Sequence, residues 1–181
     1  MNQGLIPSRY AKALFEFATE KSADSRIYEL MHTLEGSFAS EPSLQQAVAN
    51  PFIPASDKVK LLTSAAGASA DDEVYARFLR LLVDNNRLDA ARDIALAYMR
   101  LYRSEHHIYL VTVTSAAPMG AAEEERLKKL IARHLNGGTM EYHHRVDPAL
   151  IGGFTVNINN EKLDASVADE LKQLRLKLLS N

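Results

Sequence analysis

Histidine is the side chain of this sequence best suited to bind a metal ion or to exchange a proton near neutral pH, and the chain has six. Four of them form two adjacent pairs, His106-His107 and His143-His144. Both pairs border or lie in stretches with a strand-like pattern, and neighbouring residues of a strand point to opposite faces of the sheet. One pair therefore cannot chelate one ion. We expect these histidines to be solvated or hydrogen-bonded on a sheet face.

Acidic and hydroxyl side chains also gather at a few points, and helix chemistry explains them. The acidic runs at 71–73 and 123–125 lie where helices are predicted to begin, and carboxylates there cap the first turn and oppose the helix dipole. Asp164 and Ser166 precede a predicted last helix, with Ser166 suited as its N-cap. No phosphate-loop, dinucleotide, zinc-protease or serine-hydrolase motif occurs. We therefore predict a chain that is not an enzyme, with no catalytic residue, no metal and no cofactor.

The composition is that of a folded and nearly neutral chain. It has 181 residues, of which 46% are hydrophobic, and a formal net charge of −2. That length allows one domain or two small ones, and the charge gives no reason to expect a nucleic acid as partner. The absence of cysteine excludes disulfides, thiol nucleophiles and cysteine-ligated metals. No apolar run approaches the ~20 residues that span a bilayer, and the first residues lack a secretory signal pattern.

Helical periodicity fills the chain up to about Glu105, where strand periodicity begins. Six helices are predicted, at 5–21, 24–39, 42–49, 54–66, from 71–73 to 84–86, and at 88–104. Asp24 is expected to cap the second, and Gly67 to end the fourth.

The second part alternates between strands and helices. It is predicted to contain strands at 107–114, 139–146 and 153–158, a helix at 121–135, a tight hairpin at Asn159-Asn160, a short strand, and a last helix at 167–179. The predicted fold class is therefore mainly α, with an N-terminal six-helix bundle (1–105) followed by a smaller C-terminal α/β part (106–181).

The first and fifth helices carry more apolar surface than a bundle helix needs. In each, the apolar residues cover an arc of roughly 200°, about twice what a helix on the surface of a core requires. In the sixth helix the apolar residues keep mostly to one side. Two readings stay open. Either both helices are central and bury the whole arc, or they are neighbours that leave an apolar groove for a partner helix.

Four stretches of the sequence resemble the delta subunit family of F-type ATP synthase, which in mitochondria is the oligomycin-sensitivity-conferring protein. The opening R-Y-A-x-A-L-F-x-x-A pattern occurs at 9–18, and N-P-x-I/V-x-x-x-x-K-x-x-x-L begins at Asn50. F-L-x-L-L-x-x-N-x-R-L begins at Phe78, and D-P-x-L-I-G-G-x-x-V-x-I begins at Asp147. The order and spacing of all four fit a resemblance over nearly the full chain.

The resemblance implies a stator role without catalysis. In that family the groove between helices one and five binds the N-terminal helix of an alpha subunit, and the C-terminal part binds the b subunits of the peripheral stalk. Carried over by position, the groove residues are Tyr10, Leu14, Phe17, Tyr75, Phe78, Leu79 and Leu82. The C-terminal signature residues, with structural roles, are Asp147, Pro148, Gly152, Gly153, Asp164 and Ser166.

The expected function follows from these two contacts. One copy per complex would hold the catalytic head to the membrane sector against rotor torque, so that proton transport stays coupled to ATP synthesis. The expected location is the cytoplasmic face of the bacterial inner membrane, reached only through the complex. An unrelated adaptor that binds another amphipathic helix is the alternative, and a small enzyme using His143 or His144 is a more remote one.

Overall fold

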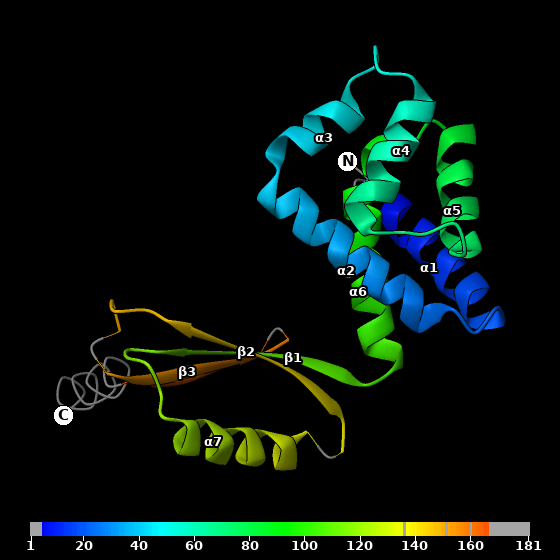
Figure 1. Cartoon of the computed structure of the whole chain (residues 1–181). Coiled ribbons are helices and arrows are strands. Elements are labelled where there is room, and N and C mark those ends of the chain that lie inside the picture. The colour runs from blue at the N-terminus through cyan, green and yellow to red at the C-terminus, as the bar shows by residue number, and fades with distance from the viewer. Residues whose placement is uncertain (1–4, 136, 151, 160, 167–181) are drawn as a thin grey trace. The chain divides into compact units, whose positions relative to one another are not determined.

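The chain folds into two compact units that divide between Arg103 and Ser104. The computed structural model describes residues 5–135, 137–150, 152–159 and 161–166. Each unit has its own hydrophobic core, so the two are described separately (Figure 1). Among the described residues, no helix combines the length and the apolar composition that crossing a membrane requires.

The N-terminal unit is built from α-helices, as the periodicity predicted. They are α1 (Leu5–Glu20), α2 (Asp24–Ser40), α3 (Pro42–Ala49), α4 (Ala55–Ala66), α5 (Glu73–Asp84) and α6 (Ala91–Glu105). A short 3-10 turn, η1 (Leu88–Ala90), precedes α6, so the predicted sixth helix is regular only from Ala91. Gly67 ends α4 in the left-handed conformation with φ 66°, which confirms its predicted role, because glycine has no Cβ to clash there.

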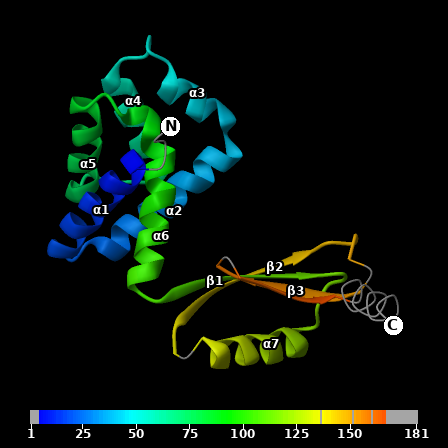
Figure 2. The same cartoon turned by 180° about the vertical axis from the view of Figure 1, so that it is seen from behind.

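The core of this unit takes buried side chains from all six of its described helices. Its largest fully buried side chains include Met31 and Leu34 from α2, Leu79 from α5, and Ile94 and Tyr98 from α6. The Tyr98 hydroxyl donates a hydrogen bond of 3.0 Å to the Asp24 carbonyl, which satisfies the one polar atom of that ring. Helices α1 and α5 contact each other at one side of the unit, and both views show them side by side (Figures 1 and 2).

Two predicted caps are wrong in detail. Asp24 is the first residue of α2, whereas Ala23 occupies the N-cap position and makes no side-chain cap. Asp72 does occupy the N-cap position of α5, but its carboxylate does not bond the helix N–H groups. It is held by Arg26 and Ser69 instead. Local sequence identifies residues that favour a cap, and tertiary partners decide which acceptor they use.

The C-terminal unit is a four-stranded sheet in the order β2-β1-β3-β4, with one described helix on it. The elements are β1 (Ile108–Ser115), α7 (Ala121–His134), β2 (Thr139–Val146), β3 (Gly153–Ile158) and β4 (Glu161–Ser166). Strands β1 and β2 are parallel, joined by α7, and pair Val111 with Tyr142. Strand β3 runs antiparallel to β1 and pairs Val113 with Val156. This confirms the predicted smaller α/β part.

Helix α7 covers one face of the sheet and buries its apolar stripe there. The core consists of Val111 and Val113 from β1, Val156 from β3, and Leu127, Ile131 and Leu135 from α7 or its end. The spacing of the last three, four residues apart, puts them on one helix face. Glu123 accepts a hydrogen bond of 3.1 Å from the Gly120 N–H, in the first turn where the acidic run was predicted to act.

The hairpin between β3 and β4 and the bend at Gly153 are confirmed, whereas the first strand begins one residue later than predicted. Asn159 has φ 51° and its side chain accepts a hydrogen bond of 3.0 Å from the Leu110 N–H. Gly153 has φ 79° at the start of β3. His107 has φ 51° and lies before β1, so the pair His106-His107 belongs to a turn and not to the strand. The predicted last helix, and with it the cap role of Ser166, lies outside the described residues.

Candidate functional site

Helices α1 and α5 leave an apolar groove between them. Its volume is about 210 Å³, and it is lined by Tyr10, Ala13, Leu14, Phe17, Arg77, Phe78 and Leu81. Leu14 and Phe78 are each 4% exposed and form its floor, while Tyr10 and Phe17 are half-buried. Leu81 is 44% exposed, which is unusual for a leucine in a helix that also supplies core residues. The apolar arc of each helix therefore contributes on one side to the core and on the other side to the groove.

The family resemblance assigns seven residues to this groove, and the structure separates them into two layers. Tyr10, Leu14, Phe17 and Phe78 line the groove. Tyr75, Leu79 and Leu82 are at most 1% exposed and belong to the core behind it. Ala13, Arg77 and Leu81 line the groove as well but were not named. The signal that could have found Leu81 is its helical position three residues after Phe78 and four after Arg77.

The groove floor is fixed by the layer behind it. The rings of Tyr75 and Phe78 are 6.3 Å apart between centroids. The buried Tyr75 hydroxyl donates a hydrogen bond of 3.1 Å to the Leu62 carbonyl of α4. Burial raises the pKa of Tyr75 well above its ordinary value, so the phenol stays protonated as a donor. Phe78 is thus supported from below, which makes the groove largely preformed.

The groove offers apolar contact and almost no polar chemistry. Of its lining residues, Arg77 alone is charged. The arginine guanidinium lies 6.0 Å from the centroid of the Phe17 ring. Such a surface can accept the aliphatic and aromatic side chains of an amphipathic helix, at about 1.5–3 kcal/mol per fully buried side chain.

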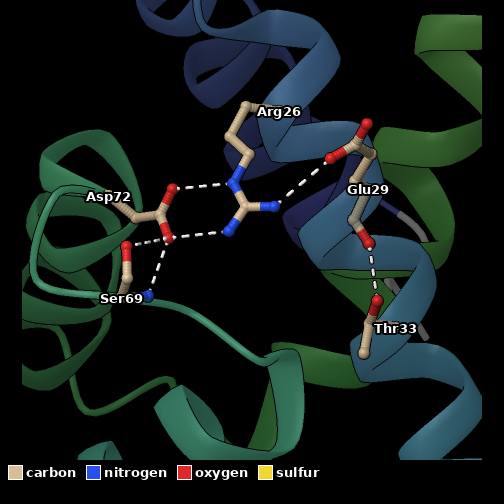
Figure 3. A network of polar contacts seen from close by, with 5 residues as sticks. All are labelled: Arg26, Glu29, Thr33, Ser69 and Asp72. Atoms are coloured by element: carbon tan, nitrogen blue, oxygen red, sulfur yellow. Dashed lines mark hydrogen bonds and ion pairs between the residues drawn. The ribbon is translucent and has the colours of Figure 1, made fainter.

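A polar pocket continues from one end of the groove and shares Phe17 and Arg77 with it. Its volume is about 460 Å³, and its wall contains the ion pair of Arg26 with Asp72 (Figure 3). Arg26 donates from Nε and Nη2 to the two oxygens of Asp72, at 2.9 and 3.1 Å. The Ser69 N–H and hydroxyl donate to the same carboxylate. These donors lower the pKa of Asp72 to about 2, the Arg26 hydrogen bond being the main cause.

The C-terminal unit carries a second, larger groove of about 660 Å³. It lies where the loop after β1 meets α7 and the start of β3. Its lining is mostly apolar and consists of Ser115, Ala116, Ala117, Pro118, Met119, Glu123, Arg126, Leu127, Leu130, Gly152, Gly153 and Phe154. Leu130 is 61% exposed on the rim. Gly152 and Gly153, named from sequence as structural, both lie in this lining.

The remaining signature residues act in the backbone of this unit. Asp147 accepts a hydrogen bond of 2.9 Å from the Ala149 N–H, and so tightens the turn after β2 that Pro148 occupies. In the backbone register, Asp164 pairs with Thr155 and Ser166 with Gly153.

The histidines whose side chains the structure describes do not assemble a reactive centre. His144 Nε2 lies 2.7 Å from the Ser115 hydroxyl, which itself donates a 2.6 Å hydrogen bond to the Ala117 carbonyl. Since that hydroxyl proton is engaged with a carbonyl, the histidine nitrogen donates to Ser115 and cannot act as its base. His143 is exposed. Within the described part of the chain, no three His, Cys, Asp or Glu side chains gather in a way that could hold a metal ion.

Comparisons with known proteins agree over nearly the whole chain. Residues 6–178 match the sequence model of the family described as ATP synthase delta (OSCP) subunit. The ATP synthase subunit delta of Parabacteroides distasonis is 40% identical over 181 residues, covering 100% of this chain and 99% of that one. The ATP synthase subunit delta of Phocaeicola vulgatus is 34% identical, covering 98% and 95%.

Among solved structures, a chain of the Toxoplasma gondii mitochondrial ATP synthase hexamer has a similar fold. The TM-score is 0.75 at 21% identity, with 96% of this chain and 97% of that chain covered. At 21% identity this similarity supports the fold alone.

Proposed function

The chain belongs to the ATP synthase delta (OSCP) subunit family and is a peripheral-stalk subunit of F-type ATP synthase, and we propose how its two units do this work. In this proposal the protein is a structural connector without catalysis. The N-terminal unit binds the catalytic head, and the C-terminal unit binds the stalk. Membrane association is peripheral, through the complex, at the cytoplasmic face of the bacterial inner membrane.

The head contact in this proposal is the groove between α1 and α5, and its occupant is the N-terminal helix of an alpha subunit. The observation that carries it is the apolar lining left open to solvent, with Leu81 44% exposed beside a floor of Leu14 and Phe78. A helix that buried three or four apolar side chains there would gain on the order of 5–10 kcal/mol before the cost of association is subtracted.

The stalk contact in this proposal is the groove of the C-terminal unit, and its occupants are the b subunits. The exposed Leu130 and the apolar walls supplied by Met119 and Phe154 support this choice. Glu123 and Arg126 at the same groove could pair with charged residues of a long stalk helix. The polar cluster of Ser115 and His144 would keep β1 and β2 aligned beneath that contact.

The mechanism is mechanical, and its requirement can be stated as a rate. A connector resists rotor torque only if each contact outlasts many catalytic turnovers. With an association rate constant of about 10⁶ M⁻¹s⁻¹, a nanomolar contact dissociates roughly once in 10³ s. Typical enzyme turnover is about 1–10³ per second, so such a contact would persist through many turnovers. Two apolar grooves on separate units are suited to give two contacts of that kind.

The test of the head contact is Leu81→Asp, with Leu61→Asp as its matched control. Leu61 lies on α4, is 40% exposed and does not line the groove. The first measurement is calorimetric titration with a peptide that copies the N-terminal helix of the alpha subunit from the same organism. We expect one-to-one binding with a negative heat-capacity change, weakened about 30-fold or more by Leu81→Asp and unchanged by Leu61→Asp.

The second measurement is coupling in the assembled enzyme. Leu81→Asp should lower ATP-driven proton pumping while ATP hydrolysis by the isolated head stays normal. Phe78→Asp is a poorer probe, because Phe78 is 4% exposed and its replacement would damage the core. A folded wild-type protein that does not bind the peptide would refute the head contact and return the alternative of an unrelated helical adaptor.

A further inference from the structure

The groove between α1 and α5 contains one feature that apolar docking does not explain. Arg77 is the single charged side chain among the residues that line it, and the other six are apolar or aromatic. It stands on the rim beside Phe17, where the groove meets the polar pocket. A helix that fills the groove must cover this guanidinium at least in part.

The contacts that Arg77 makes within the chain do not satisfy it for burial. Its Nη2 lies 3.9 Å from Glu73 Oε2, at the outer limit of an ion pair. The two side chains are 64% and 79% exposed, so water screens this i,i+4 pair and leaves it weak. Glu73 also lies in the first turn of α5, where the helix dipole already favours its charge.

Burial of an arginine against an apolar helix is unfavourable unless an anionic partner arrives with it. The loss of water around a guanidinium is unfavourable, and a carboxylate that makes two parallel N–H···O bonds offsets that loss best. The neighbouring Asp72 cannot serve, because Arg26 and Ser69 already occupy its oxygens. Among the described residues, Glu73 is the carboxylate paired with Arg77, and at 3.9 Å that pair is loose, so a closely placed carboxylate on the docking helix would be the better partner.

We propose that Arg77 is a specificity-determining residue, which selects a docking helix that carries an Asp or Glu beside the end of its apolar stripe. This inference rests on the proposed head contact and names the chemistry of its occupant. A helix with Lys or Arg at the same place would be rejected, because two buried cations would face each other.

The groove also fixes where on the occupant this carboxylate must lie. Tyr10 and Phe17 are seven residues apart on α1, which is roughly 10 Å or two helical turns. An occupant that runs along α1 would fill this length with apolar residues at positions i, i+3 or i+4, and i+7. Since Arg77 stands at the Phe17 end, the carboxylate belongs about one turn beyond the apolar residue that sits on Phe17.

The test is a double-mutant cycle with the alpha-subunit peptide and the full-length protein. Each Asp or Glu of the peptide is replaced, one at a time, by Asn or Gln. Each peptide is titrated into the wild-type protein, Arg77→Met and Arg80→Met. Arg80 is the matched control, because it is an exposed arginine of the same helix that does not line the groove. Helical circular dichroism and melting temperature establish that the variants are folded.

We expect that one of the peptides with an Asn or Gln replacement binds the wild-type protein about tenfold more weakly than the parent peptide does. Against Arg77→Met, the same peptide and the parent peptide should bind equally well. Against Arg80→Met, the replaced peptide should again bind about tenfold more weakly than the parent peptide. The coupled loss should shrink as salt is raised. If Arg77→Met binds the parent peptide as tightly as wild type, or if every acid replacement acts equally on both proteins, Arg77 selects nothing. In that outcome the proposed head contact survives, whereas absence of wild-type binding removes both.

Discussion

Arg26 in α2 and Asp72 at the start of α5 are 46 residues apart in sequence and are joined by two hydrogen bonds of 2.9 and 3.1 Å. The Asp72 side chain is 8% exposed, while that of Arg26 is 47% exposed. The pair fixes the loop before α5 to the start of α2 and thereby holds the N-terminal end of α5 in place (Figure 3). One wall of the groove between α1 and α5 therefore depends on a contact outside the groove.

Asp72→Asn should destabilise the N-terminal unit and leave its fold intact. The amide keeps the size of the side chain but loses the ion pair, and it turns a donor toward the Arg26 guanidinium. We expect a loss of about 1 kcal/mol, since one partner is solvated, which lowers the melting temperature by about 4–8 °C. The neighbouring Asp71→Asn is the control, because Asp71 is exposed. Equal melting temperatures for the two variants would mean that the ion pair contributes nothing.

The same pair gives a defined acid dependence. The pKa of Asp72 is lowered from 3.8 to about 2 in the folded protein, so at intermediate pH the unfolded chain binds a proton that the folded chain does not. The stabilisation is complete above pH 4 and is lost as the pH falls toward 2. Urea unfolding of wild type and Asp72→Asn at several pH values should show the gap between them closing over this window. A gap that stays constant down to pH 2 would contradict the assignment.

Two glycines should respond in opposite directions to the same substitution. Gly36 lies inside α2 with nothing within 4 Å of an added Cβ, so Gly36→Ala should stabilise by about 0.5–1 kcal/mol. At Gly138 an added Cβ would overlap the Tyr109 ring and come within 2.9 Å of the His107 carbonyl. Gly138→Ala should cost about 1–3 kcal/mol. Chemical denaturation measures the free energy of unfolding of both variants. An unchanged free energy of unfolding for Gly138→Ala would show that the Tyr109 ring moves aside.

Ile131→Ala should unfold the C-terminal unit without affecting the other. Ile131 is 6% exposed in the core beneath α7, and its truncation leaves a cavity that costs about 2–5 kcal/mol. Hydrogen exchange should accelerate in β1, α7 and β3 while the amides of α2 and α6 keep their protection. Leu34→Ala, in the core of the N-terminal unit, should give the reverse pattern. Loss of protection in both units from either variant would mean that they fold as one.

Leu130→Asp should separate the two proposed contacts. Leu130 is 61% exposed on the rim of the C-terminal groove, so a charge there leaves the core intact. We expect weaker binding to the soluble part of the b subunits and unchanged binding to the alpha-subunit peptide. Pull-down and calorimetry measure the two in parallel. Unchanged binding to b would place the stalk contact elsewhere on the C-terminal unit.

The local pattern of the chain was sufficient for most of the described elements and for the family. Pro42, Gly67, Gly153 and Asn159 act as predicted, because a proline at a helix start and residues at positive φ are requirements of the backbone within a few residues. The strand limits at 139–146 and 153–158 follow in the same way from alternation and turn residues.

What each side chain contacts was decided only by the tertiary structure. The 200° arcs on α1 and α5 could not be divided by periodicity, because Tyr75 and Leu81 differ only in which neighbour happens to cover them. Packing against α4 buries Tyr75 and leaves Leu81 44% exposed. Arg77 as the one charge in the groove and Asp72 as the partner of Arg26 likewise depend on residues distant in sequence. A single sequence specifies local backbone geometry directly, whereas contacts across tens of residues exist only once the chain has folded.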